Sequence, residues 1–110
     1  MKIEELQHGE ATILSPQGPL IGQDAEQLAE HIAKVLGDSR GPIVLDASKV
    51  AIVDSRGLEV LADATEQLIR SGRALRLCGV NPTVQEVLEL TELADLFEQF
   101  EDAESAVEGL

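Results

Sequence analysis

The sequence predicts a small α/β domain in which a mixed, mainly parallel sheet carries its helices mainly on one side. Two observations lead to this fold class. Short apolar runs of strand length alternate along the chain with segments whose apolar residues recur at helical spacing. The chain has 110 residues, the size of one domain, and we expect a single domain over residues 1–110. The expected order of elements is β-β-α-β-α-β-α-β-α, with right-handed crossovers.

The chain begins with a predicted hairpin. Its strands are expected at Lys2–Leu6 and Glu10–Ser15, with Gly9 near the turn. The proline- and glycine-containing segment Pro16–Pro19 then breaks the second strand.

A first helix is predicted to begin at Asp24, with Gln27 at the spacing of a capping box. Gly37 suits a left-handed stop at its end. Its apolar residues repeat at helical spacing: Ala25, Leu28, Ala29, Ile32 and Leu36.

The middle of the chain predicts a buried strand and a second helix. The run Ile43–Asp46 is apolar and ends in an acid, which fits a buried parallel strand, and Ala51–Val53 extends or rejoins it. Asp54 and Ser55 then open a helix that Gly72 ends. Its apolar face is expected to hold Leu58, Leu61, Ala62, Thr65, Leu68 and Ile69.

The last part predicts two more strand and helix pairs. Ala74–Val80 reads as a buried strand, and Asn81 followed by proline starts a helix as its cap. A short strand around Phe97–Phe100 precedes a terminal helix capped by Asp102. Eight apolar residues are expected to be largely buried: Leu28, Ile32, Val44, Leu61, Leu68, Leu75, Leu77 and Leu88.

Composition limits the function classes. The net charge of −13 would repel a phosphate backbone, and the two aromatic residues, Phe97 and Phe100, offer little stacking surface, so no nucleic-acid partner is expected. No apolar run approaches the ~20 residues of a membrane helix, and the first residues have no apolar stretch. We therefore expect a cytoplasmic protein without membrane insertion. Acidic residues crowd the chain after Arg76, either as a solvated face or as a surface complementary to a basic partner. Cys78, the single cysteine, is expected to be a buried apolar residue.

The most informative stretch is Ile43–Leu61, with the letters IVLDASKVAIVDSRGLEVL. It begins with a strand that ends in an acid. A loop follows, and then an Asp-Ser-Arg-Gly-Leu turn at the start of a helix. This stretch resembles the signature of the STAS family, of the anti-sigma-factor-antagonist type. The segments Pro16–Leu20, Leu75–Pro82 and Leu90–Phe97 are similar to other parts of the family, in the same order. The resemblance implies a STAS fold and a regulatory protein rather than an enzyme, with no cofactor.

The turn has chemistry of its own. A helix start has unpaired N–H groups, and either Asp54 or Ser55 can cap it. Gly57 allows another backbone to come close. A phosphoryl group on a serine here would be held by the N–H groups and would add negative charge. On a protein-binding face that charge would oppose binding, so the turn could act as a phosphorylation switch. The alternative is that these residues only cap the helix. Asp46 is expected to cap the loop before the turn.

The resemblance also implies a partner and exposes one departure. The family's phosphoacceptor is usually the hydroxyl residue directly before the glycine, but Arg56 stands there, one residue after Ser55. Either Ser55 is phosphorylated instead or the domain is not switched at this turn, and we favour the second. The implied partner is an anti-sigma factor or a switch-type serine kinase. The expected partner-binding turn is made of Asp46, Asp54, Ser55, Arg56, Gly57 and Leu58. The alternative function is a non-phosphorylated scaffold subunit of a lipid-transport or stressosome-like assembly, and a homodimer remains open.

Other sites find little support in the sequence. A serine hydrolase would need a base near Ser55 and a first glycine before it, and both are missing from the pattern. A phosphate receiver would need paired acids after its first strand and a lysine after its last, and neither is present. His8, His31 and Cys78 have no metal-ligand spacing, so we expect no catalytic residue and no metal site.

Overall fold

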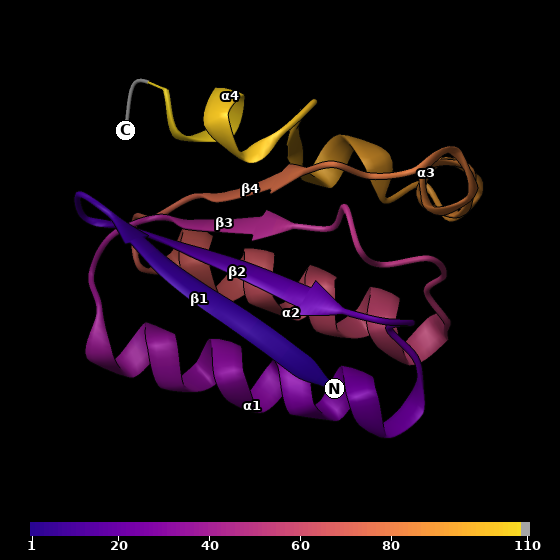
Figure 1. Ribbon diagram of the computed structural model, residues 1–110, viewed down its shortest axis with the longest axis horizontal. Helices are drawn as coiled ribbons and strands as arrows, with labels where there is room; N and C mark the ends of the chain where they lie inside the picture. Colours follow the sequence, from indigo (N-terminus) through magenta and orange to yellow (C-terminus); the bar gives the residue numbers. More distant parts are fainter. Residues whose placement is uncertain (109–110) are drawn as a thin grey trace.

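A five-stranded mixed sheet organises residues 1–108, the part of the chain that the computed structural model describes (Figure 1). The strands follow one another in chain order, from β1 to β5, and only β1 runs antiparallel to its neighbour. The strands are β1 Lys2–His8, β2 Ala11–Gln17, β3 Ile43–Asp46, β4 Leu75–Cys78 and β5 Glu98–Phe100. The helices are α1 Gly22–Asp38, α2 Ser55–Arg70, α3 Pro82–Leu90 and α4 Ala103–Val107, with a short 3₁₀ turn at Ala94–Leu96. The predicted fold class and element order are confirmed.

Each face of the sheet has its own apolar layer, because successive residues of a strand point to opposite sides. On β3, Ile43 and Leu45 point into the main core, which α1, α2 and α3 cover, while Val44 points to the other face. There it packs with Cys78 under Ala106 of α4. The helices therefore lie mainly on one side, with α4 alone on the second face (Figure 1). All eight apolar residues expected to be buried are buried.

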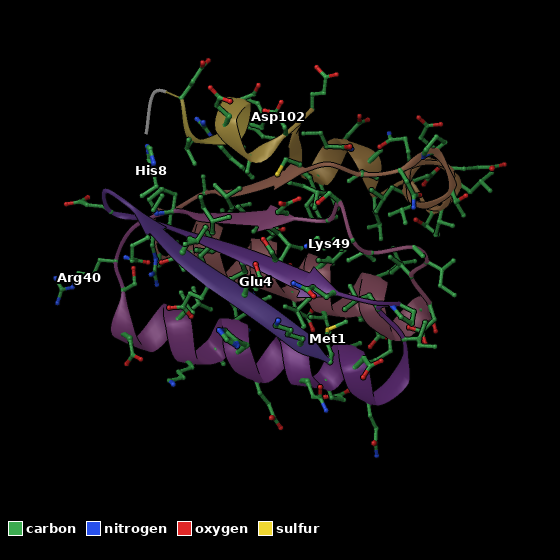
Figure 2. The ribbon with its side chains drawn as sticks, in the orientation of Figure 1. Met1, Glu4, His8, Arg40, Lys49 and Asp102 are labelled. Atoms are coloured by element: carbon green, nitrogen blue, oxygen red, sulfur yellow. The ribbon has the colours of Figure 1, made fainter. Side chains whose placement is uncertain are left out.

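The predicted ends of α1 are wrong, because contacts from distant parts of the chain set them. The helix begins at Gly22, and its N-cap, Ile21, makes no side-chain capping bond. The capping box does not form, since Gln27 instead accepts a hydrogen bond from the amino group of Met1, which lies against α1 (Figure 2). The helix continues through Gly37 and ends after Asp38.

The far end of α1 is closed by Arg73, which follows α2 in the chain. Its guanidinium donates to the carbonyl oxygens of Leu36 and Ser39. These two carbonyls belong to the group that a helix C-terminus leaves unpaired. A tertiary contact thus replaces the glycine stop that the sequence predicts.

Two smaller details also differ from prediction. Strand β2 continues through Pro16, which pairs with Ile3 of β1 beyond the three residues of β2 that pair with β3. On α2, Ile69 is 61% exposed, whereas Val60 and Ala64 are buried. The buried arc of α2 is turned toward α1 because this helix packs on α1 as well as on the sheet. Within residues 1–108, no helix is long and apolar enough to cross a bilayer.

Candidate functional site

The Asp54–Leu58 turn lies at the carboxyl end of β3, where the chain crosses over to α2. A single parallel bridge between Leu20 and Val53 brings the start of α1 beside the start of α2. Helix α2 begins at Ser55, whose side chain is exposed, and Asp54 is its N-cap. The predicted place of Ser55 at the helix start is confirmed.

The carboxylate of Asp54 joins the N-termini of the two long helices. One oxygen, Oδ1, accepts a hydrogen bond from the amide of Gly57 at 2.8 Å, and Oδ2 accepts from the amide of Gly22 at 3.0 Å. These bonds, that of Gly57 first, lower the pKa of Asp54 below its usual value. The carboxylate is therefore a charged cap that fixes the turn, and of the two candidate caps it is Asp54 that serves.

Gly57 is required by the close approach of two backbones. A Cβ atom at this position would lie 2.4 Å from the carbonyl oxygen of Leu20 and 2.7 Å from Cγ1 of Val53. Both distances are far inside van der Waals contact, so a larger residue would push the first turn of α2 away from the bridge. This agrees with the role that the sequence predicts for Gly57. The next residue, Leu58, is buried in the main core and anchors the turn.

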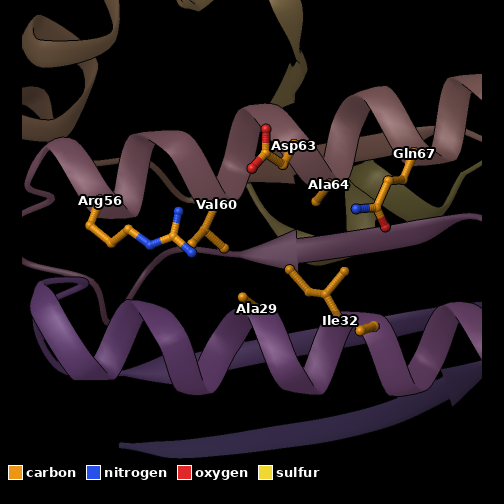
Figure 3. Close-up of a pocket in the computed structure, with 8 residues that line it drawn as sticks. Ala29, Ile32, Arg56, Val60, Asp63, Ala64 and Gln67 are labelled. Atoms are coloured by element: carbon orange, nitrogen blue, oxygen red, sulfur yellow. The ribbon is translucent and has the colours of Figure 1, made fainter.

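Arg56 is turned away from the exposed side of the turn and toward α1. Its guanidinium donates to Glu26 of α1 through Nε, and to Glu59 of α2 through Nη1 at 2.9 Å. Figure 3 shows the side chain lying in the space between the two helices. The hydrogen bond from Arg56 lowers the pKa of Glu26, and the two carboxylates raise the pKa of Arg56. Position 56 is thus occupied by a cation that two acids neutralise.

The loop before the turn is held from three directions. Asp46 accepts a hydrogen bond from the amide of Ser48 at 3.0 Å, which confirms its predicted place as a loop cap. The amide of Ala47 donates to the carbonyl oxygen of Cys78 at 2.8 Å. The side-chain amide of Asn81 donates to the carbonyl oxygens of Val50 and Ala51. The sequence predicts Asn81 only as the cap of α3, because nothing local indicates its second set of bonds.

Two isoleucines that the sequence analysis did not single out flank the turn. Ile21 is 37% exposed and Ile52 is 48% exposed, while their neighbours Leu20 and Val53 point toward the core. The amide of Leu20 donates to the carbonyl oxygen of Ile52 at 2.9 Å, so the two segments run together. The sequence signal that could have found these isoleucines is the alternation of inward and outward side chains along the two extended segments. The alternation leaves Ile21 and Ile52 partly exposed in the two segments that lead to Gly22 and Asp54, which are joined by a hydrogen bond.

The remaining candidates lie apart from the turn. His31 is 2.8 Å from Glu5 of β1. His8 lies near the hairpin turn, at the opposite end of the sheet (Figure 2). Residues 1–108 contain no group of three or more side chains suited to hold a metal ion. Cys78 is fully buried, as predicted, and its burial raises the pKa of the thiol to about 12.

Comparison with known proteins agrees with the family resemblance found in the sequence. The model of the STAS domain family matches residues 2–106. BtrV of Bordetella bronchiseptica, which carries the name of a candidate anti-sigma factor antagonist, is 33% identical over 73 residues. That alignment covers 66% of this chain and 63% of BtrV, so it spans less than two thirds of the relative.

Solved structures show the same fold. A candidate anti-sigma factor antagonist from Thermotoga maritima superposes with a TM-score of 0.91 at 24% identity, covering 96% of this chain and 92% of that one. An anti-sigma factor antagonist from Mycobacterium paratuberculosis gives a TM-score of 0.85 at 23% identity, covering 96% and 90%. At such identities the likeness concerns the fold alone.

Proposed function

Because the chain belongs to the STAS domain family, we propose that it is an anti-sigma-factor-antagonist-like regulatory protein. It binds an anti-sigma factor or a switch-type serine kinase through the Asp54–Leu58 turn, and Asp46 supports the loop that leads to it. The name of BtrV supports the regulatory class. The observation that carries the proposal is an exposed serine at a helix start, in a turn whose backbone Asp54 holds by hydrogen bonds to two helices.

Rigidity and surface chemistry both support partner binding at this turn. Asp54 fixes the backbone from both helices, so the turn is already in one conformation and loses little freedom on binding. Ile21 and Ile52, in the segments that lead into the two helix starts, offer apolar surface that a partner can remove from water. Protein interfaces commonly combine an apolar core with a rim of polar groups, and these residues supply both kinds of surface.

We further propose that binding does not require phosphorylation of the turn. Arg56 has no hydroxyl, so no phosphate ester can form at the position that the family resemblance assigns to the acceptor. Ser55 is exposed and leaves the capping to Asp54, so a kinase could reach it. However, Asp54 already takes the amide of Gly57, and its charge would repel a phosphate on the next residue. The turn therefore suits a constitutive binder better than a switch.

A capture experiment tests the partner class. Wild-type protein and the variant Ser55→Glu serve as baits in extracts of the source organism. The matched control is Thr83→Glu, which adds the same charge at an exposed hydroxyl residue of α3. Mass spectrometry should find an anti-sigma factor or serine kinase with wild type and control, and far less of it with Ser55→Glu. If no protein of either class is enriched, the proposed partner class is wrong. If all three baits capture it equally, the turn is not the binding site.

A phosphorylation assay tests the second part. The captured kinase and Mg·ATP are added to wild type, Ser55→Ala, Arg56→Ser and the double variant Arg56→Ser with Glu26→Gln. Intact-mass measurement should show no phosphate on wild type, and phosphate on the double variant. Stoichiometric phosphorylation of wild type at Ser55, with release of the partner, would falsify the constitutive reading while leaving the partner class intact.

A further inference from the structure

A second feature of the molecule is a groove between α1 and α2, which begins at Arg56 and runs along α2 to Gln67 (Figure 3). Its floor is apolar, since Ile32, Val60 and Ala64 line it and each is only 3% exposed. On the α1 side it is bordered by Ala29 and Ala33, which are one helical turn apart. These small side chains leave a hollow of about 220 Å³ between the helices.

The size of the hollow indicates a side chain rather than a small molecule as its occupant. Ligand pockets usually enclose about 300–1,000 Å³, and this hollow is smaller and open to solvent. On α2 the groove extends from Arg56 to Gln67, about three helical turns. A groove of this length between two packed helices fits a third helix that inserts one or two apolar side chains.

The charge around the groove decides what kind of helix fits. Asp63 lines the groove, and Glu30 and Glu66 lie beside it on the exposed sides of the two helices. Among the described residues, no ion pair involves any of these three acids. Arg56 closes one end of the groove, but Glu26 and Glu59 neutralise it. The exposed Arg70, one helical turn beyond Glu66, adds one further cation near the end of α2. Acids still outnumber cations around the rim of the groove, as they do in the whole chain with its net charge of −13.

We propose that the groove between α1 and α2 docks a basic amphipathic helix of a partner protein. An aliphatic side chain of that helix enters the hollow over Ile32, Val60 and Ala64, and its lysines or arginines face Glu30, Asp63 and Glu66. Burial of the aliphatic side chain supplies affinity, and the complementary charges supply orientation and speed of association. This second surface does not depend on Ser55 or on phosphorylation.

A designed peptide tests the proposal directly. The probe is a helical peptide of about 14 residues, long enough to cover the groove, with leucines on one face and lysines on the other. The first control peptide has the same composition with the leucines scattered around the helix, and the second carries glutamate in place of lysine. Amide chemical shifts of the labelled protein locate the binding site, and titration gives the affinity. We expect shifts centred on residues 29–33 and 60–67, and affinities at least about tenfold lower for both controls.

Matched variants of the protein complete the test. Ala33→Trp fills the hollow at an exposed position, and Asp63→Lys with Glu66→Lys reverses two charges of the rim. The control pair Glu86→Lys with Glu89→Lys makes the same charge change on α3. The two groove variants should each weaken binding at least about tenfold, and the control pair by less than about threefold. Absence of binding, shifts spread over α3 and α4, equal binding of the scattered peptide, or equal losses in both reversal pairs would each overturn the proposal. Amide spectra of the variants verify that they remain folded.

Discussion

Removing the side chain of Asn81 should loosen the loop that leads to the Asp54–Leu58 turn, and the loss of unfolding free energy follows from the hydrogen bonds that Asn81 makes. Asn81 caps α3, since its side-chain oxygen accepts from the amide of Val84 at 2.8 Å. Its side-chain nitrogen donates to the carbonyl oxygens of Val50 at 3.2 Å and of Ala51 at 3.1 Å. Loss of an N-cap costs about 1 kcal/mol. Each neutral hydrogen bond contributes about 0.5–1.5 kcal/mol, at the lower end where water can replace it, as it can at the exposed Ala51.

The expected loss of unfolding free energy for Asn81→Ala is therefore about 2 kcal/mol, which corresponds to roughly 8 °C in Tm for a domain of this size. The variant Asn81→Ser separates the two contributions. A serine hydroxyl is a good N-cap but is too short to reach the loop, so this variant should lose about 1 kcal/mol. Urea unfolding followed by circular dichroism measures both values.

Amide hydrogen exchange measures whether the loop itself loosens when Asn81 is replaced. The amides of Gly18 and Leu20 donate to the carbonyl oxygens of Lys49 and Ile52 in the loop. Both should exchange faster in Asn81→Ala and in Asn81→Ser, relative to the amide of Ile43, which bonds outside the loop. If Asn81→Ser loses as much stability as Asn81→Ala, the capping bond contributes nothing. If neither variant speeds exchange at Gly18 and Leu20, Asn81 does not hold the loop.

Three further outcomes are expected from the core, a helix end and the buried thiol. Leu61→Ala should lower the unfolding free energy by about 2–5 kcal/mol, whereas Ile69→Ala, at a position 61% exposed, should change it by less than about 0.5 kcal/mol; similar values in urea unfolding would mean that α2 packs on another face. Glu92 follows α3 with a φ of 61°, a backbone conformation that favours glycine. Glu92→Gly should therefore raise the unfolding free energy by about 0.5–1 kcal/mol, whereas Glu89→Gly inside the helix should lower it by about 1 kcal/mol. A lower unfolding free energy for Glu92→Gly would contradict this. Burial raises the pKa of Cys78 from 9.0 to about 12, so the unfolded thiol loses its proton at lower pH than the folded one, and stability present below pH 9.0 is lost as the pH rises toward 12. The unfolding free energy should therefore fall less steeply with rising pH in Cys78→Ala than in wild type. Equal slopes for the two proteins would show that the thiol does not contribute to the pH dependence.

The sequence predicts most accurately those parts of the fold that depend on neighbouring residues. Asp54 caps α2 and Asn81 caps α3 through amides three residues further on. Such bonds form within one turn of chain, so the residue order alone indicates them. The strands and the eight buried positions were likewise predictable, because alternation and helical spacing act over a few residues.

The parts that were not predictable depend on residues far apart in the chain. The first amide of α1, on Gly22, is satisfied by Asp54, which lies 32 positions later. The last carbonyls of α1 are satisfied by Arg73, 34 and 37 positions away. Local signals at Asp24, Gln27 and Gly37 were present, yet these tertiary bonds set the helix ends. The direction of Arg56 was hidden for the same reason, because its partner Glu26 lies on another helix.

The direction of Arg56 changes what its presence means for a phosphate switch. Position 56 is one residue past Ser55, which rotates it by ~100° around α2 toward Glu26 and Glu59. A hydroxyl placed there would face two carboxylates that Arg56 now neutralises, and a phosphate on it would meet their combined repulsion. Restoring an acceptor at position 56 therefore requires the loss of a neighbouring negative charge as well, which is why the double variant with Glu26→Gln is the informative one. Because Arg56 and Glu26 contact each other directly, their effects on this surface are expected to be coupled, and the two single variants together with the double variant measure that coupling.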